Sequence, residues 1–285
     1  MSKRNSQEAK RVARERLRAE REKEAKKAKM RRQLGVAGAV VAALAVMGGI
    51  GFAVTKMLEP ENQDWSDAQK VAEGASSAGR YSSYEAPANT EGRDGVDIVI
   101  GDKDAKNTVS VYEDMRCPVC ASFEQLNGNT ISKDIEEGKY KAEFVFGTFL
   151  DRNPAIAGTG SRNALSALGA ALNVSPEAFL EYKKILFSSD VHPDEGKDDF
   201  GSDKYLINAA QDVKDLKGNK SFEDDVNNGT FDPWALKVSK KFDDDKDVTG
   251  TPSIKLNGKK VETAQGGAPM TPDQFREFVH DRLEK

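Results

Sequence analysis

The sequence predicts an α/β domain that follows a single N-terminal membrane-spanning helix. Residues 34–54 carry no charge, short β-rich runs flank a long helical stretch, and the charge is divided between two regions. The first 32 residues hold 14 Lys and Arg against 5 Asp and Glu, whereas the residues after 55 hold 29 basic and 42 acidic side chains. This acidic bulk excludes nucleic acid as a ligand of the folded part, because phosphate binding needs a net basic face.

The uncharged segment predicts a transmembrane anchor over residues 34–55. At about 1.5 Å per residue, its length matches a hydrocarbon core of roughly 30 Å. A buried core helix is usually shorter, and a secretory signal peptide has a shorter apolar core and a small-residue cleavage site. The positive-inside rule then places the basic arm, residues 1–33, in the cytoplasm, beside anionic lipid, and the residues after the anchor on the other side of the cell membrane.

Residues 56–95 are rich in Gly, Ala and Ser and predict a flexible linker, with a helical turn near Trp65–Val71. The pattern then changes to two β-rich runs, over 96–100 and 108–112. A helix follows from Cys117, with Val119, Phe123 and Leu126 on one face, and Asn127-Gly128-Asn129 is expected to break or bend it. Residues 140–150 alternate as a strand, so this half is β-β-α-β.

A helical block is predicted over about 154–245. Its candidate helices are 162–173, one capped by Ser175-Pro176, 204–217, 222–227 and one capped by Asp232-Pro233. A strand over 251–256 and a second at 260–261 flank Asn257-Gly258, a strong hairpin signal. Thr271-Pro-Asp-Gln274 is a capping box that opens the last helix.

Cys117-Pro-Val-Cys120 is the motif that carries chemistry. Pro118 at the first helical position puts Cys117 near the N-cap, where free backbone N–H groups and the helix dipole favour a thiolate. Cys120 lies one turn further in and is the natural resolving thiol. A structural disulfide in so short a loop constrains little chain entropy, and the two histidines, His192 and His280, have no zinc-finger spacing. We therefore expect redox chemistry, with no metal and no cofactor.

These residues resemble a known family. Asp114-Met-Arg-Cys117-Pro-Val-Cys120 before a helix, and Thr249-Gly-Thr-Pro252 before an Asn-Gly hairpin and a terminal helix, are similar to a DsbA-like thioredoxin-fold thiol:disulfide oxidoreductase. The helical block is a second mark of that family. The resemblance covers residues 96–285, and the anchor and linker resemble those of membrane-bound bacterial members.

The resemblance implies a thioredoxin fold with an inserted helical block. It makes Cys117 the exposed nucleophile, Cys120 its partner and Pro252 a cis residue facing them. It also implies that the backbone of Thr251 pairs with the substrate like an added strand. The candidate substrate-binding residues are Pro118, Val119, Thr251 and Pro252.

One departure concerns proton transfer. Relatives often place a buried carboxylate six residues before the first cysteine, where this sequence has Val111. Glu113 and Asp114 are the candidates for proton transfer; Glu113 is expected to be a solvated charge at a strand end, and Asp114 matches a common family position. His192 and His280 are expected at the surface.

The sequence thus predicts a membrane-tethered extracytoplasmic enzyme that forms disulfides in exported cysteine-containing proteins. A membrane quinone-linked partner would reoxidise it, as the resemblance implies. Two alternatives stay open: a disulfide reductase or isomerase that uses the same pair, and a non-catalytic extracellular binding module with a structural disulfide.

Overall fold

The computed structural model describes residues 64–74, 84–194 and 196–284, all within the unit Leu58–Lys285. The predicted basic arm (1–33) and membrane anchor (34–55) lie outside the described residues. Within the described ranges, no helix combines the length and the apolar character needed to cross a bilayer.

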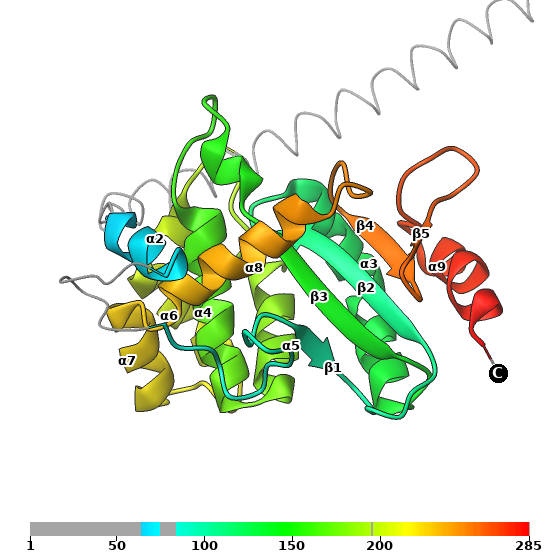
Figure 1. Ribbon diagram of the computed structural model, residues 1–285, viewed down its shortest axis with the longest axis horizontal. Helices are drawn as coiled ribbons and strands as arrows, with labels where there is room; N and C mark the ends of the chain where they lie inside the picture. Colours follow the sequence, from blue (N-terminus) through cyan, green and yellow to red (C-terminus); the bar gives the residue numbers. More distant parts are fainter. Residues whose placement is uncertain (1–63, 75–83, 195, 285) are drawn as a thin grey trace, which may run out of the picture. The chain divides into compact units, whose positions relative to one another are not determined.

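A five-stranded mixed sheet forms the centre of the domain (Figure 1). Its spatial order is β1-β3-β2-β4-β5; β2 and β3 are parallel, and the other neighbours are antiparallel. The middle strand, β2, therefore has partners on both sides, and its Val109 and Val111 are fully buried. The strands are β1 (Ile98–Ile100), β2 (Thr108–Asp114), β3 (Lys141–Gly147), β4 (Ser253–Leu256) and β5 (Lys259–Val261).

Helices cover both faces of the sheet (Figure 1). Helices α3 (Pro118–Glu136) and α9 (Pro272–Phe278) pack together on one side, with the rings of Phe123 and Phe275 6.3 Å apart. Helix α8 (Asp232–Asp244) lies on the other face, where Phe242 packs against Tyr112 of β2. Because side chains alternate along a strand, Glu113 points to the face opposite Tyr112.

The helical block lies between β3 and β4, as predicted. It comprises α4 (Gly160–Val174), α5 (Pro176–Leu186), α6 (Asp203–Ala209) and α7 (Lys220–Asn228), with 3-10 turns at Phe149–Arg152, Asp199–Gly201 and Ala210–Asp212, and it leads into α8. Helix α4 is its centre, and nearly all of its residues are buried. The Ser175 hydroxyl accepts the Ala178 N–H, so the predicted cap of α5 is confirmed. The α/β fold with an inserted helical block is confirmed.

Two local signals near the C-terminus are also confirmed. Asn257 and Gly258 both have positive φ, 50° and 76°, and connect β4 to β5 as the Asn-Gly hairpin requires. Thr271 and Gln274 form the predicted capping box at the start of α9. A short 3-10 turn, His280–Arg282, follows this helix.

The predicted break at Asn127-Gly128-Asn129 is wrong, since α3 runs through it without interruption. The Asn127 amide donates to the carbonyl oxygens of Phe123 and Met270, which ties it to the neighbouring chain. Gly128 has a packing role instead: a Cβ atom there would lie 2.4 Å from Oε1 of Glu124. The glycine makes room for a carboxylate and does not end the helix.

The helical turn predicted near Trp65–Val71 is confirmed by α2 (Ser66–Ala72), whereas the flexible linker predicted over 56–95 is wrong for its described part. Helix α2 (Ser66–Ala72) buries Ala68 and Val71, together with Trp65 just before it, and packs against α8 (Figure 1). Residues after 83 are also held, because the Trp234 indole N–H donates to the Gly95 carbonyl at 2.8 Å. Residues 56–63 and 75–83 lie outside the described part.

Several element boundaries differ from those predicted. The strand expected from Thr251 begins at Ser253, after the Thr251–Pro252 peptide. The helix expected over 204–217 ends as α6 at Ala209 and continues only as a 3-10 turn. Asp232 is the first residue of α8, and Phe231 takes the cap position.

Candidate active site

The two cysteines lie at the start of α3, directly after the turn that follows the middle strand β2. Cys117 is the N-cap residue and Pro118 is the first helical residue, as the sequence predicts. Cys117 is only 8% exposed, so the expectation of an exposed nucleophile is wrong, and Cys120 is fully buried one turn further in. Val119, between them, is 51% exposed and presents an apolar side chain beside the cysteines.

A second segment, 134 residues further along the chain, lies against the first cysteine. The Thr251–Pro252 peptide bond is cis, which agrees with the expectation from the family resemblance. The Thr251 carbonyl oxygen lies 3.9 Å from Sγ of Cys117. The Thr251 hydroxyl is buried and has no well-aligned hydrogen-bond partner among the described residues, and Thr251 acts to lower the pKa of both thiols.

The two thiols have opposite acidities. Hydrogen bonding from Cys120 lowers the pKa of Cys117 to about 6, against the opposing effect of burial. The Thr251 hydroxyl and the backbone N–H groups of Val119 and Cys120 lower it further. Burial raises the pKa of Cys120 well above its usual range, and the neighbouring charge of Glu113 adds to this rise. The arrangement stabilises a thiolate on Cys117 and a neutral thiol on Cys120.

Glu113 is not the solvated charge that the sequence predicts, because its side chain is fully buried. Burial raises its pKa to about 7, and the effect of Lys183, whose Nζ lies 2.9 Å from Oε2, only partly offsets this rise. Neither Glu113 oxygen has a well-aligned hydrogen bond within the described residues. A carboxyl group of this kind changes its protonation near neutral pH beside the thiol pair.

Asp114 is also buried, but its oxygens are occupied. Burial raises its pKa to about 6, opposed first by a hydrogen bond from the Ser161 hydroxyl at 2.6 Å. The backbone N–H groups of Arg116 and Leu150 donate to the same carboxylate at 3.0 and 3.1 Å. This carboxylate fixes the turn before Cys117 and joins it to α4.

Arg116, the residue before Cys117, points away from the thiols into the helical block. Its side chain is 1% exposed and forms an ion pair with Asp151 at 3.2 Å. It also donates to the Ile156 carbonyl at 2.8 Å and lies 3.4 Å from Asp198. These contacts attach the turn that carries Cys117 to two loops of the block.

Two charged residues that the sequence analysis missed lie beside Glu113. Lys183 of α5 is 1% exposed and is ion-paired with both Glu113 and Glu124. A signal for Lys183 was present, since it lies at i+4 from Phe179 on the apolar stripe of its helix. Glu124 likewise lies at i+4 from the buried Cys120.

Both histidines are half-buried, so their expected surface position is wrong. The His192 ring stacks on Phe187 at 5.8 Å, and burial lowers its pKa. His280 Nε2 lies 2.5 Å from the buried carboxylate of Asp134. His192 thus packs against the end of α5, and His280 connects the C-terminal segment to α3.

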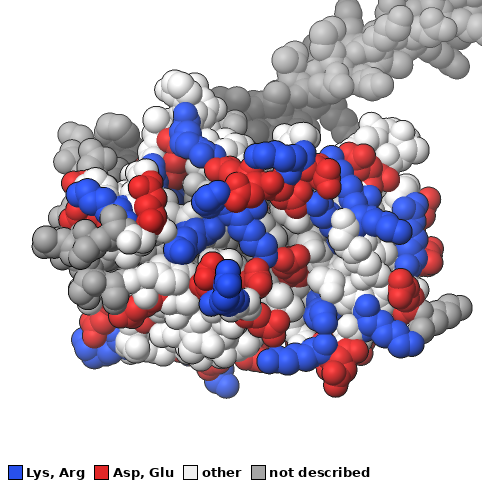
Figure 2. Space-filling view, in the orientation of Figure 1, with Lys and Arg blue, Asp and Glu red and all other residues white. Residues whose placement is uncertain are grey.

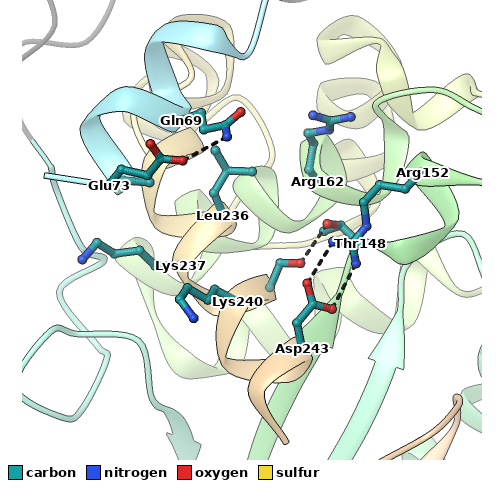
Figure 3. Close-up of a pocket in the computed structure, with 11 residues that line it drawn as sticks. Gln69, Glu73, Thr148, Arg152, Arg162, Leu236, Lys237, Lys240 and Asp243 are labelled. Carbon is teal, nitrogen blue, oxygen red and sulfur yellow. Dashed lines mark hydrogen bonds and ion pairs between the residues drawn. The ribbon is translucent and has the colours of Figure 1, made fainter. Parts of the chain in front are cut away.

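Two hollows differ in their relation to the cysteines. A cavity of about 260 Å³ is lined by Pro252, by Thr251, whose carbonyl oxygen contacts Cys117, and by the end of the β4–β5 hairpin, and neither cysteine lines it. A second, of about 310 Å³, lies between α2 and α8 (Figure 3). In this second hollow, both terminal guanidinium nitrogens of Arg152 donate to the Asp243 carboxylate. Figure 2 shows basic side chains in front of α8 with acidic side chains beside them. None of the predicted site residues lines this second hollow.

Comparisons with known proteins agree with this geometry. A family model described as thioredoxin matches residues 93–281. Disulfide bond formation protein D of Bacillus subtilis is 28% identical over 189 residues, which is 65% of this chain and 77% of that protein. Among solved structures, reduced DsbG of Mycobacterium tuberculosis is 27% identical with a TM-score of 0.52, over 66% of this chain and 89% of that one. Reduced DsbA of the same organism is 27% identical with a TM-score of 0.52, over 65% and 93%.

The chain therefore belongs to the thioredoxin family that this model describes. Within it, the chain is a DsbA-like protein thiol:disulfide oxidoreductase. The alternative of a non-catalytic binding module is thereby set aside.

Proposed function

We propose that the enzyme forms disulfides in exported proteins through Cys117 and Cys120. The observation that carries this proposal is the low pKa of Cys117, about 6, beside a buried Cys120 whose pKa is raised. A stabilised thiolate favours the reduced form of the pair, so the oxidised form passes its disulfide on readily. The same property disfavours the reductase alternative, which needs a pair that gives up electrons easily.

The reaction consists of two thiol–disulfide exchanges. A substrate thiolate attacks Sγ of Cys117 in the oxidised pair, the Cys117–Cys120 bond breaks, and Cys120 leaves and takes up a proton. A second substrate thiolate then attacks the substrate sulfur of the mixed disulfide and releases Cys117 as a thiolate. The substrate is oxidised by two electrons, and the enzyme keeps them as two reduced sulfurs.

The substrate chain would lie between the active-site turn and the cis-proline loop. The exposed Val119, with Pro118, offers an apolar contact on one side of Cys117. Thr251 and Pro252 line the cavity on the other side, where the backbone of Thr251 would pair with the extended substrate. Recognition by main-chain bonds suits an enzyme that accepts many sequences.

Glu113 is the group we assign to proton transfer with Cys120. It is buried, its charge acts on both thiols, and its oxygens lack well-aligned hydrogen bonds among the described residues. A pKa of about 7 lets it give a proton in one half-reaction and take one in the other. Asp114 is assigned a structural role, since three donors already hold it.

We place the catalytic domain outside the cytoplasm, tethered by residues 34–55 in the cell membrane. The uncharged segment and the basic residues before it support this topology. A quinone-linked membrane oxidase would then accept the two electrons and restore the disulfide. A membrane-impermeant thiol reagent added to intact cells tests the location: it should label reduced Cys117 of the full chain without lysis.

Trapping of substrates tests the function. Cys120→Ser leaves Cys117 able to form mixed disulfides that no enzyme thiol resolves, so exported cysteine-containing proteins should accumulate on it. The matched control, Cys117→Ser, should trap none. Equal trapping by both variants, or the absence of exported proteins from the trapped set, would refute the proposal.

A further inference from the structure

The helical block contributes a buried charge to the redox site. Lys183 of α5 lies between two carboxylates, with its Nζ 2.9 Å from Glu113 and 2.5 Å from Glu124. The same ammonium lies 5.1 Å from the ring of Phe144 and 5.3 Å from that of Phe187. Lys183 is 1% exposed, and the two carboxylates and two aromatic faces around it stabilise its buried positive charge.

Glu113, Glu124 and Lys183 come from three different elements, which the two ion pairs bring into contact. Glu113 is near the end of β2, four residues before Cys117. Glu124 is on α3, one turn after Cys120. Lys183 comes from α5, which belongs to the insertion and not to the sheet. The Gln125 amide donates to the Phe187 carbonyl at 2.8 Å and holds α5 against α3 at this point.

We propose that Lys183 is a positioning residue through which the helical block keeps Glu113 ionised, so that Glu113 can take the proton of Cys120 when the pair is reoxidised. This inference rests on the role assigned above to Glu113. It gives the inserted helices a part in the chemistry.

The charged and titratable groups around Glu113 favour opposite forms of its carboxyl group. Burial, Glu124 and Cys117 favour its neutral form, and Lys183 favours its ionised form. Asp114, the next residue, points to the other face of the strand, where Ser161 and two backbone N–H groups hold it. Lys183 stays an ammonium, because its two carboxylate partners outweigh the effect of burial on its pKa. Without it, Glu113 would carry a proton at neutral pH.

The two half-reactions then depend on Lys183 differently. When substrate is oxidised, Cys120 leaves Cys117 and receives a proton, which a neutral Glu113 can give. When the pair is reoxidised by a disulfide oxidant, ionised Glu113 takes the Cys120 proton. The Cys120 thiolate then attacks Sγ of Cys117 in the mixed disulfide and expels the oxidant's thiolate. Loss of the lysine should slow the second process and spare the first.

The test follows both half-reactions by rapid mixing, with oxidised glutathione as oxidant and a reduced dithiol peptide as substrate. In Lys183→Met, resolution of the Cys117–glutathione disulfide should slow about fivefold at pH 7, and its rise with pH should move up by about one unit. Peptide oxidation should change by less than about threefold. Lys183→Arg should restore the profile, and Lys184→Met, at the exposed neighbour, should leave it unchanged. An equal loss in both half-reactions, or an unmoved pH profile, would overturn the proposal.

A second variant decides the question where Lys183→Met does not fold. Glu124→Gln removes a charge that favours neutral Glu113, so the same pH profile should move in the opposite direction, to lower pH. An unmoved profile in this variant contradicts the proposal. Glu113→Gln separates the two hypotheses: if it leaves resolution unchanged, the role of Glu113 itself is wrong. If it abolishes the pH-dependent rise while the Lys183 and Glu124 variants do nothing, only the further inference fails.

Discussion

Replacement of Thr251 by valine removes one hydroxyl from the vicinity of Cys117 and keeps the shape of the side chain. With a pKa of about 6, Cys117 is about 90% thiolate at pH 7. A hydrogen bond to a charged group contributes about 1.5–3 kcal/mol, which corresponds to about 1–2 pKa units. Thr251→Val should therefore raise the Cys117 pKa to about 7–8 and lower the thiolate share at pH 7 to about 10–50%. At pH 7 the same rise in pKa makes the reduction potential of the pair about 20–30 mV more negative, because the neutral thiol then becomes the main reduced form.

The assay for this prediction is a pH titration of thiolate absorbance in the reduced enzyme, with alkylation rates as an independent measure. Thr251→Ser is the matched control, because it keeps the hydroxyl and should retain a pKa near that of the wild type. The Thr251 carbonyl, 3.9 Å from the sulfur, is present in all three proteins. An unchanged pKa in Thr251→Val would show that the hydroxyl does not stabilise the thiolate.

Three further predictions concern stability. Arg116→Met should lower the unfolding free energy by about 3–5 kcal/mol in a urea titration, because it breaks a buried ion pair, whereas Arg152→Met at an exposed pair should cost less than about 1 kcal/mol. Gly128→Ala should destabilise α3 in a thermal melt, against the usual gain of about 1 kcal/mol, since the new Cβ would collide with Glu124; a stabilised variant contradicts this packing. The raised pKa of Glu113 means that ionising this carboxyl group costs the wild-type fold stability as pH rises from about 4.5 to 7. Glu113→Gln has no such group, so its unfolding free energy should rise relative to that of the wild type by up to about 3 kcal/mol over this range. A constant difference between the two proteins across that range would refute this prediction.

Local signals in the sequence were sufficient to predict the thiol pair and most of the fold. Pro118 fixes the start of α3, and it leaves Cys117 at the end of the helix where backbone N–H groups are free. The Thr271 capping box and the Asn257-Gly258 turn are equally local, because each depends on residues within four positions of one another. Such features can be predicted because they depend on neighbouring residues and not on contacts across the fold.

The environment of the thiols could not be predicted in the same way, because it depends on contacts across the fold. From the sequence alone, Glu113 is expected to be a solvated charge at a strand end. In the fold, α5 places Lys183 beside it, although Lys183 lies 70 residues further along the chain. Gly128 reads as a helix breaker until the folded Glu124 carboxylate occupies the space where its side chain would be. Trp65 belongs to a segment of linker-like composition and is buried only by tertiary packing.

The reduction potential of the Cys117–Cys120 pair tests the central claim most directly. The enzyme would be equilibrated in glutathione buffers at pH 7, and the fraction of reduced pair measured by alkylation. A stabilised Cys117 thiolate predicts a pair that is more oxidising than thioredoxin, with a potential above about −270 mV and toward about −120 mV. A potential near about −270 mV would identify a reductase and contradict the proposed direction of the reaction, and a pair that resists reduction below about −300 mV would be a structural disulfide.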